Sequence, residues 1–310
     1  MNYLIVGLGN IGKKRKTLLG ERCIYTADPY QPDADFRQYA DAPPEKFDAV
    51  ILSGPNHVKI EQLTHFLKLR KHVLVEKPLL FPDDFAASEL KSLSKQTGAI
   101  WYTSYNHRFE PLIQRMKKLL DEGAVGTIYK ARLLYGNGTV RNNIGNWREE
   151  GYGILDDLGC HLIDLTCFLF GELSVDYLPW DLRRIESKNY DYGLLAAPGR
   201  RIVLEFGSIF WKNTFAIEVL GERGSLHLSG LCKWGGSELL IRSRVFPSGA
   251  PIESQETATP PDPTWAKDLE EFEHCAAEGR CSYENDLRIN RSMQTAARHW
   301  LEQEAERCGE

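Results

Sequence analysis

The sequence has no hydrophobic run long enough to cross a membrane, no CxxC pair and no surplus of positive charge. A membrane-spanning helix is therefore not expected, and a formal net charge of −5 gives no reason to expect a nucleic-acid partner. The seven cysteines are odd in number and widely spaced. We therefore expect reduced thiols, no metal site and a cytoplasmic protein. The chain begins with a core strand, so no cleavable signal segment is expected.

The first third of the chain alternates short apolar runs with amphipathic stretches. Strands are predicted at residues 3–6, 23–27, 47–52, 73–75 and 99–103, and helices at 58–70 and 83–97. This alternation predicts an α/β fold with a doubly wound parallel sheet. Ligands bind beyond the carboxyl ends of such strands, and the chemically active side chains of this region follow the strands.

Residues 7–12, GLGNIG, directly follow the first strand. In this pattern Gly7 permits a tight turn, Gly9 lets a pyrophosphate approach the backbone, and Gly12 lets the next helix pack on the strand. Asp28 ends the second strand about twenty residues further on, where an acid can bind ribose hydroxyls. Residues 29–33 offer no arginine or lysine for a 2′-phosphate. These features favour NAD over NADP. The basic run 13–16 could touch phosphates, but a solvated first helical turn is the preferred interpretation.

The character of the chain changes after Gly123 and Gly126. Following a helix at 111–122, longer strands are expected at 128–135, 175–185, 201–206, 214–220 and 225–228, with a hairpin turn at 221–224. Residues 247–263 read as a surface loop and 264–308 as a helical region. We therefore predict two domains: a Rossmann domain at 1–120, and at 121–310 an α+β domain with a large, open, mostly antiparallel sheet.

Two segments contain the candidate chemistry. Lys77, in Glu76-Lys77-Pro78, stands at the end of a strand, where the reactive end of a dinucleotide is expected. In the second half, Asp157 and His161 lie four residues apart in an apolar stretch, which puts them on one face if the stretch is a helix. Such a pair is open to three interpretations: a structural hydrogen bond, metal ligation, which lacks an obvious third ligand, or catalysis.

These motifs together resemble the Gfo/Idh/MocA family, the group of glucose–fructose oxidoreductase, inositol dehydrogenase and rhizopine catabolism proteins. The resemblance rests on GLGNIG, FDAVILSGPNH, KHVLVEKPL, YNHRFEP, GYGILDDLGCHLIDL and AIEVLGERGSLHL, and covers nearly the whole chain. It implies an N-terminal Rossmann domain and a C-terminal domain whose open sheet often mediates oligomers, so a homo-oligomer (dimer or tetramer) is expected.

At the positions of this chain that match the family's motifs, the resemblance implies that Lys77, Asp157 and His161 form the catalytic group. We favour His161 as the base for a substrate hydroxyl, with Lys77 stabilising the developing alkoxide, and Asp157 orienting the ring or binding substrate. The reverse assignment of base stays open, because a buried lysine can also act as one. A cis bond before Pro78 is possible. The chain departs from the family at Ser53-Gly54, where Ala-Thr is common, and at Lys59, where histidine is common.

The expected binding residues form two sets. The cofactor set is Gly7, Gly9, Asn10, Ile11, Gly12, Asp28, Ser53, Pro55, Asn56, His57, Glu76, Lys77 and Asn106. The substrate set is Lys77, Arg108, Tyr135, Asn137, Trp147, Asp157 and His161, in which aromatic, amide and guanidinium groups suit a polyhydroxylated ring.

The leading functional hypothesis is an NAD-dependent dehydrogenase that oxidises a secondary hydroxyl of a sugar, polyol or nucleotide sugar. Two alternatives stay open. One is a redox-neutral epimerase or glycosidase with tightly bound NAD, and the other is a non-catalytic regulator that senses NAD or a sugar. Neither a nucleic acid nor a membrane is expected as a partner.

Overall fold

The computed structural model describes residues 1–145, 149–171, 177–197, 199 and 201–309, and the chain divides into two compact units. The first unit comprises Met1–Asn106 and Trp265–Asn290, and the second comprises His107–Thr264 and Arg291–Glu310. This division differs from the expected boundary at residue 120. The helix that follows Asn106 packs on the sheet of the second unit, and the segment that follows Thr264 belongs to the first unit.

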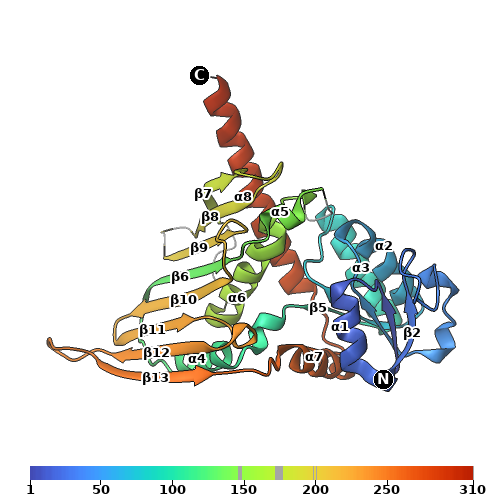
Figure 1. Ribbon diagram of the computed structural model, residues 1–310, viewed down its shortest axis with the longest axis horizontal. Coiled ribbons are helices and arrows are strands. Elements are labelled where there is room, and N and C mark those ends of the chain that lie inside the picture. The colour runs from blue at the N-terminus through green and yellow to red at the C-terminus, as the bar shows by residue number, and fades with distance from the viewer. Residues whose placement is uncertain (146–148, 172–176, 198, 200, 310) are drawn as a thin grey trace. The chain divides into compact units, whose positions relative to one another are not determined.

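The first unit contains a five-stranded parallel sheet of order β2-β1-β3-β4-β5. Its two outermost strands, β2 and β5, are labelled in Figure 1. Its strands are β1 Tyr3–Val6, β2 Cys23–Ala27, β3 Ala49–Leu52, β4 His72–Glu76 and β5 Trp101–Ser104. The helices are α1 Asn10–Leu19, α2 Asn56–Lys68, α3 Asp84–Thr97 and α7 Thr264–Glu278, with short helical turns at η1 Gly20–Arg22, η2 Tyr39–Asp41 and η3 Pro44–Lys46. The predicted doubly wound sheet is confirmed.

Burial on both faces explains why these strands are apolar throughout. Leu4, Val50 and Val73 lie in a core that α2 and α3 cover, while Tyr3, Ile5 and the other alternate side chains lie in a second core. Helix α7 supplies Leu269 and Phe272 to that second core, so residues from the end of the chain complete the first unit.

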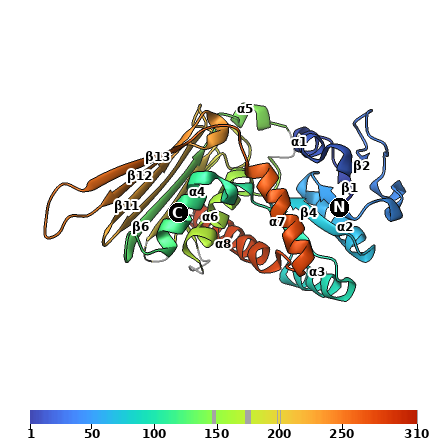
Figure 2. The same cartoon turned by 90° about the horizontal axis from the view of Figure 1, so that it is seen from below.

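The second unit contains an eight-stranded sheet of order β13-β12-β11-β10-β6-β9-β8-β7, antiparallel except for the β6–β9 pair. Its strands are β6 Ile128–Gly136, β7 Leu178–Arg183, β8 Tyr192–Ala196, β9 Ile202–Gly207, β10 Thr214–Gly221, β11 Gly224–Ser229, β12 Ser237–Ser243 and β13 Ile252–Ala258. Helices α4 Pro111–Asp121 and α6 Cys160–Phe170 cover one face of it (Figure 2). The mostly antiparallel sheet and the hairpin between β10 and β11 are confirmed.

Shorter elements complete the second unit. They are the turns η4 Asn106–Phe109 and η8 Cys232–Trp234, the helix α5 Val140–Asn143, and the π-helical η6 Leu155–Gly159. The last helix, α8 Tyr283–Gly309, begins among residues of the first unit and ends among those of the second. No described helix is both long and apolar enough to span a membrane.

One sequence interpretation is wrong, because residues 247–263 contain strand β13 rather than only a loop. This strand lies at the sheet edge, where backbone pairing with β12 suffices and an apolar face is not needed. Its exposed polar side chains therefore resemble those of a loop, and Glu253 and Glu256 form ion pairs with Arg242 and Arg115. Strands β8 and β12 were not anticipated either.

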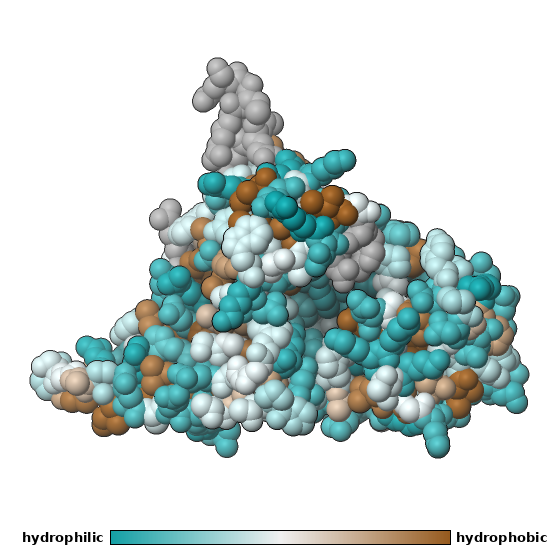
Figure 3. Space-filling view, in the orientation of Figure 1, coloured by the Kyte–Doolittle hydropathy of each residue, from teal (hydrophilic) through white to brown (hydrophobic). Residues whose placement is uncertain are grey.

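The face of the molecule drawn in Figure 3 is mostly hydrophilic, with hydrophobic side chains in small separate groups. Disulfides contribute nothing to the described part of the fold, since the six cysteines whose side chains are described remain unbridged. The stability of each unit therefore rests on its packed sheet and helices.

Candidate functional site

The glycine loop between β1 and α1 requires glycine at two positions for steric reasons. Gly7 has a φ of +93°, and a Cβ there would lie 2.9 Å from the backbone nitrogen of Gly54. A Cβ on Gly12 would lie 1.9 Å from the carbonyl oxygen of Gly7. By contrast, no atom of the described residues lies within 4 Å of the Cβ position of Gly9. The loop thus leaves open space at Gly9, beside the first residues of α1, Asn10 and Ile11, where a phosphate could meet backbone N–H groups.

Asp28, directly after β2, is fixed by backbone donors. One carboxylate oxygen accepts from the N–H of Leu8 at 2.7 Å, and the other accepts from Tyr30 and Gln31 at 2.8 and 3.0 Å. Burial alone would raise the pKa of the Asp28 carboxyl, but these backbone bonds and Arg37 outweigh it and lower the pKa below its usual value. The carboxylate is therefore charged and held against the glycine loop.

The end of β3 also fits a bound dinucleotide. The hydroxyl oxygen of Ser53 is buried and has no hydrogen-bond partner among the described residues, which is costly unless a ligand or water satisfies it. Pro55 then forms the N-cap of α2, whose first residues are Asn56 and His57. A polar group of the cofactor would satisfy the Ser53 hydroxyl.

Arg15 holds the carboxylate that precedes Lys77. Its fully buried guanidinium donates to Glu76 Oε1 at 2.8 Å and to Asp268 Oδ2 at 2.6 Å, and also to the hydroxyl of Ser104. Burial opposes the positive charge, but Glu76 and Asp268 more than compensate, so the pKa of Arg15 lies above its ordinary value. The interpretation of residues 13–16 as a solvated turn is therefore wrong for Arg15, because Arg15 is on the inner side of α1.

Lys59 holds the backbone of the same turn. Its ammonium, on a residue only 2% exposed, donates to the carbonyl oxygens of Glu76 at 2.5 Å and Pro78 at 3.0 Å, with Lys77 O at 3.3 Å. It also donates to the side-chain oxygen of Asn56 at 2.8 Å. The Lys77–Pro78 bond is cis. Two buried cations from α1 and α2 thus position the segment that presents Lys77.

The second unit contributes Asp157 and His161, from different kinds of helix. His161 is in the first turn of α6, whereas Asp157 is in the preceding π-helical stretch η6. Asp157 lines a small pocket together with Asn143, Gly153 and Tyr190. Gly159 between the two allows close approach of the Phe206 ring from β9, since a Cβ would lie 3.2 Å from that ring. Asp157 therefore lies in the turn directly before α6, four residues from His161.

His161 belongs to a chain of basic side chains that the sequence interpretation did not identify. Its Nδ1 lies 3.0 Å from Nδ1 of His107, and Nε2 of His107 lies 3.2 Å from the amine of Lys233. Both histidines are at least 95% buried. The ring of Tyr135 packs against both, with centroid separations of 5.3 Å from His107 and 5.8 Å from His161. His107 could be suspected from the segment NHRFEP, but nothing local in the sequence indicates Lys233.

The remaining substrate candidates have structural partners. Arg108 forms a two-pronged ion pair with the buried Asp164 of α6, with Nε 2.7 Å from Oδ2. The side-chain oxygen of Asn137 accepts from the backbone and hydroxyl of Thr139. Trp147 lies outside the described residues. The cofactor candidate Asn106 is buried at the end of the first unit.

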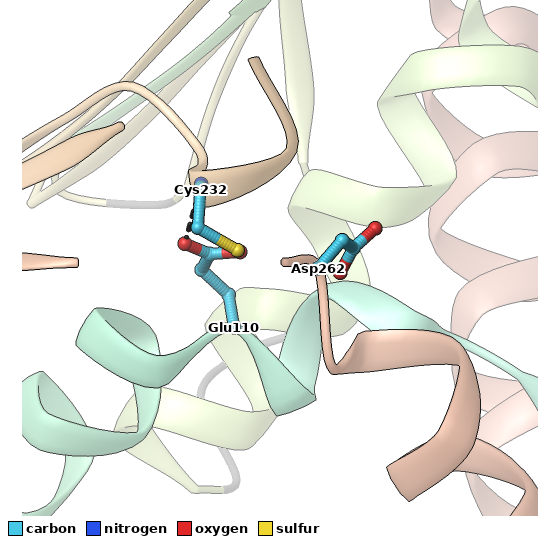
Figure 4. Close-up of side chains that lie close together, drawn as sticks. All are labelled: Glu110, Cys232 and Asp262. Atoms are coloured by element: carbon cyan, nitrogen blue, oxygen red, sulfur yellow. Dashed lines mark hydrogen bonds between the residues drawn. The ribbon is translucent and has the colours of Figure 1, made fainter. Parts of the chain in front are cut away.

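Among the described residues, one group of side chains could offer ligand atoms to a metal ion, namely Glu110, Cys232 and Asp262 (Figure 4). The thiol of Cys232 donates to Glu110 Oε2 at 3.0 Å, and the other oxygen accepts from the N–H of Cys232 and the hydroxyl of Ser237. Burial, with Glu110 adding to it, raises the pKa of the Cys232 thiol to about 12. The thiol therefore keeps its proton, and these contacts join the start of α4 to η8 and β12.

Comparison with known protein families matches both units. Residues 1–105 match the family model described as an oxidoreductase family with an NAD-binding Rossmann fold, and residues 113–227 match the GFO/IDH/MocA C-terminal domain. The chain belongs to the GFO/IDH/MocA oxidoreductase family. Its first unit is therefore an NAD-binding Rossmann domain.

Individual family members are similar to parts of the chain. YdgJ of Escherichia coli K12, an uncharacterized oxidoreductase, is 30% identical over 59% of this chain and 54% of its own length. The scyllo-inositol 2-dehydrogenase (NADP(+)) IolW of Bacillus subtilis 168 is 26% identical over 73% of this chain and 59% of its own length. Levoglucosan dehydrogenase, solved in complex with NADH, has the same fold, with a TM-score of 0.80 and 16% identity over 96% of each chain. The chain spans about half the length of the relatives it matches.

The two loop glycines should respond differently to alanine. Gly12→Ala should lower the free energy of unfolding by about 1–3 kcal/mol, because its Cβ would overlap the oxygen of Gly7. Gly9→Ala should leave the free energy of unfolding nearly unchanged, because its Cβ meets no atom, yet should weaken NAD binding at least about tenfold, equivalent to about 1.4 kcal/mol. Urea unfolding and calorimetric titration with NAD measure both effects. Unchanged NAD affinity in Gly9→Ala would place the phosphates elsewhere.

Arg15→Met should strongly destabilise the GFO/IDH/MocA fold of the first unit. It leaves Glu76 and Asp268 buried without their cation, a change that typically costs about 3–5 kcal/mol. Lys16→Met, at an exposed position of the same helix, is the matched control and should change the free energy of unfolding by less than about 0.5 kcal/mol. Urea denaturation compares the two, and equal stability of both variants would contradict the importance of the buried network.

Proposed function

We propose that this family member is an NAD-dependent dehydrogenase that oxidises a secondary hydroxyl of a sugar, polyol or nucleotide sugar. The observation that carries the proposal is the Glu76–Pro78 turn, held by the buried cations Arg15 and Lys59 at the end of β4. A turn restrained from two helices can hold Lys77 at a fixed distance from a nicotinamide.

The cofactor residues are proposed from the loop and strand ends of the first unit. Backbone N–H groups of α1, beside the open space at Gly9, would bind the pyrophosphate. Asp28, charged and next to Leu8, would accept from the adenosine ribose and repel a 2′-phosphate. The buried hydroxyl of Ser53 would donate to the cofactor. Bound NAD supplies the hydride acceptor, and the other steps fall to side chains of the protein.

For the chemistry, His161 would exchange the proton of the substrate hydroxyl and Lys77 would stabilise negative charge on its oxygen. Asp157, with Tyr135, Asn137 and Arg108, is proposed to contact the substrate. Support for a polyhydroxylated substrate comes from the name of the relative IolW, an inositol dehydrogenase. A homo-oligomer and a cytoplasmic location remain predictions.

The proposal predicts NADH formation from a pool of polyols, sugars and nucleotide sugars. Absorbance of NADH, followed with purified protein and NAD, should rise with at least one member of the pool. The same assay with NADP should give a lower kcat/KM, because Asp28 repels a 2′-phosphate; the NADP-linked name of IolW makes this comparison necessary. NAD that copurifies with the protein and is never released as NADH would instead favour the redox-neutral alternative.

Substitution of the proposed catalytic pair should separate chemistry from cofactor binding. Lys77→Ala and His161→Ala should each lower kcat at least about a hundredfold, the scale of general acid–base catalysis. NAD affinity by calorimetry should change little. Lys118→Ala, an exposed lysine on α4, is the control for loss of a lysine and should keep normal turnover. Near-normal kcat in both active-site variants would contradict the assignment.

A further inference from the structure

Three basic side chains of the second unit form a continuous hydrogen-bonded chain. Lys233, in η8, reaches Nε2 of His107, in η4, at 3.2 Å. Nδ1 of His107 then reaches Nδ1 of His161, in α6, at 3.0 Å. The two ring planes are tilted by 75° with centroids 4.2 Å apart. Lys233 is half-buried, whereas the two histidines are almost fully buried, so the chain runs from the protein surface to His161.

The charge on Lys233 determines where every proton in this chain lies. A lysine ammonium can only donate, so Nε2 of His107 must accept and carries no proton. The neutral His107 ring therefore has its proton on Nδ1 and donates it to Nδ1 of His161. Nδ1 of His161 is then an acceptor, and the neutral ring carries its proton on Nε2. With Lys233 charged, His161 offers an N–H, rather than a lone pair, at Nε2.

We propose that Lys233, His107 and His161 form a proton relay that serves the hydroxyl chemistry; this inference rests on the proposed function. With Lys233 charged, the relay is set for carbonyl reduction. A bound reduced nicotinamide would supply the hydride to the carbonyl carbon, and His161 would give its Nε2 proton to the oxygen. The Nδ1 proton of His107 passes to His161, and Lys233 gives a proton to Nε2 of His107.

Alcohol oxidation runs the same path in reverse and begins with Lys233 as the neutral amine. Nε2 of His161 then has its lone pair and takes the hydroxyl proton as hydride leaves the carbon for the nicotinamide. The Nδ1 proton of His161 passes to His107, and the Nε2 proton of His107 passes to Lys233. Lys233 becomes an ammonium and can release the proton to water. The relay thus gives a buried histidine a path for the proton that each oxidation liberates.

The surroundings of the relay are mostly aromatic. The ring of Phe215 on β10 stacks on His107 at a centroid distance of 6.0 Å, Tyr135 on β6 packs against both imidazoles, and the Lys233 amine lies 5.1 Å from the Trp234 ring. Tyr135 is the titratable group among these rings. The adjoining charged side chains pair with others: Asp164 of α6 with Arg108, and Glu110 with Cys232. In the proposed relay the imidazole tautomers follow from the Lys233–His107 and His107–His161 contacts.

The test reads the tautomers directly by two-bond ¹H–¹⁵N correlation on histidine-labelled protein without cofactor or substrate. His107→Gln and His161→Gln assign the two rings. In the native protein at pH 7, His107 should be the Nδ1–H tautomer and His161 the Nε2–H tautomer. When the pH is raised until Lys233 loses its proton, both rings should switch to the opposite tautomers together.

Two variants test whether the proton on Lys233 sets the tautomers of both rings. Lys233→Arg keeps a cationic donor that cannot lose its proton, so both rings should stay in their neutral-pH tautomers at high pH. Lys233→Met removes the donor, so the tautomers at pH 7 should differ from those of the native protein. The relay is overturned if either ring is an imidazolium at pH 7, if Lys233→Met leaves the tautomers unchanged, or if the rings of Lys233→Arg still switch. Because no substrate is present, this result is independent of whether the dehydrogenase assay succeeds.

Discussion

The buried guanidinium of Arg15 is the interaction on which the first unit depends most. Through Glu76, Ser104 and Asp268 it connects α1 to the ends of β4 and β5 and to α7. One cation facing two carboxylates would leave a buried negative charge, which is costly. The ammonium of Lys59, bonded to the carbonyl of Glu76, supplies the second positive charge. The four buried charges sum to zero, and the turn with Lys77 lies among them.

In the second unit, the residues that follow β5 form a comparable set of buried polar contacts. His107 contacts His161 and Lys233, Arg108 pairs with Asp164, and Glu110 accepts from Cys232 and Ser237. Three side chains within four positions thus connect to α6, to η8 and to β12. Each of these three side chains is charged or can become charged. A change in the charge of one therefore alters the electrostatic field at the other two. The position of His161 therefore depends on a segment more than fifty residues earlier in the sequence.

The sequence predicted what depends on local pattern. Short apolar runs predicted the parallel strands, since burial on both faces demands such residues, and the glycine spacing predicted the loop at Gly7 and Gly12, where side chains would collide. The sequence did not predict contacts between residues that are far apart in the chain. Lys59 and Arg15 look like surface cations, because their partners, the turn at Glu76 and the helix α7, are distant in the sequence. It failed at β13 because an edge strand is specified by backbone pairing rather than by apolar side chains.

The hydrogen bond between the histidines also limits what Asp157 can do. A catalytic imidazole is commonly oriented by an acceptor or donor at the nitrogen facing away from the substrate, and for His161 that place is taken by Nδ1 of His107. Asp157 lies in the π-helical turn directly before α6, four residues from His161. Under the proposed relay His107 orients the His161 ring, which leaves substrate binding as the role we propose for Asp157. His161 then needs no carboxylate to hold its tautomer, because a lysine two hydrogen bonds away determines it.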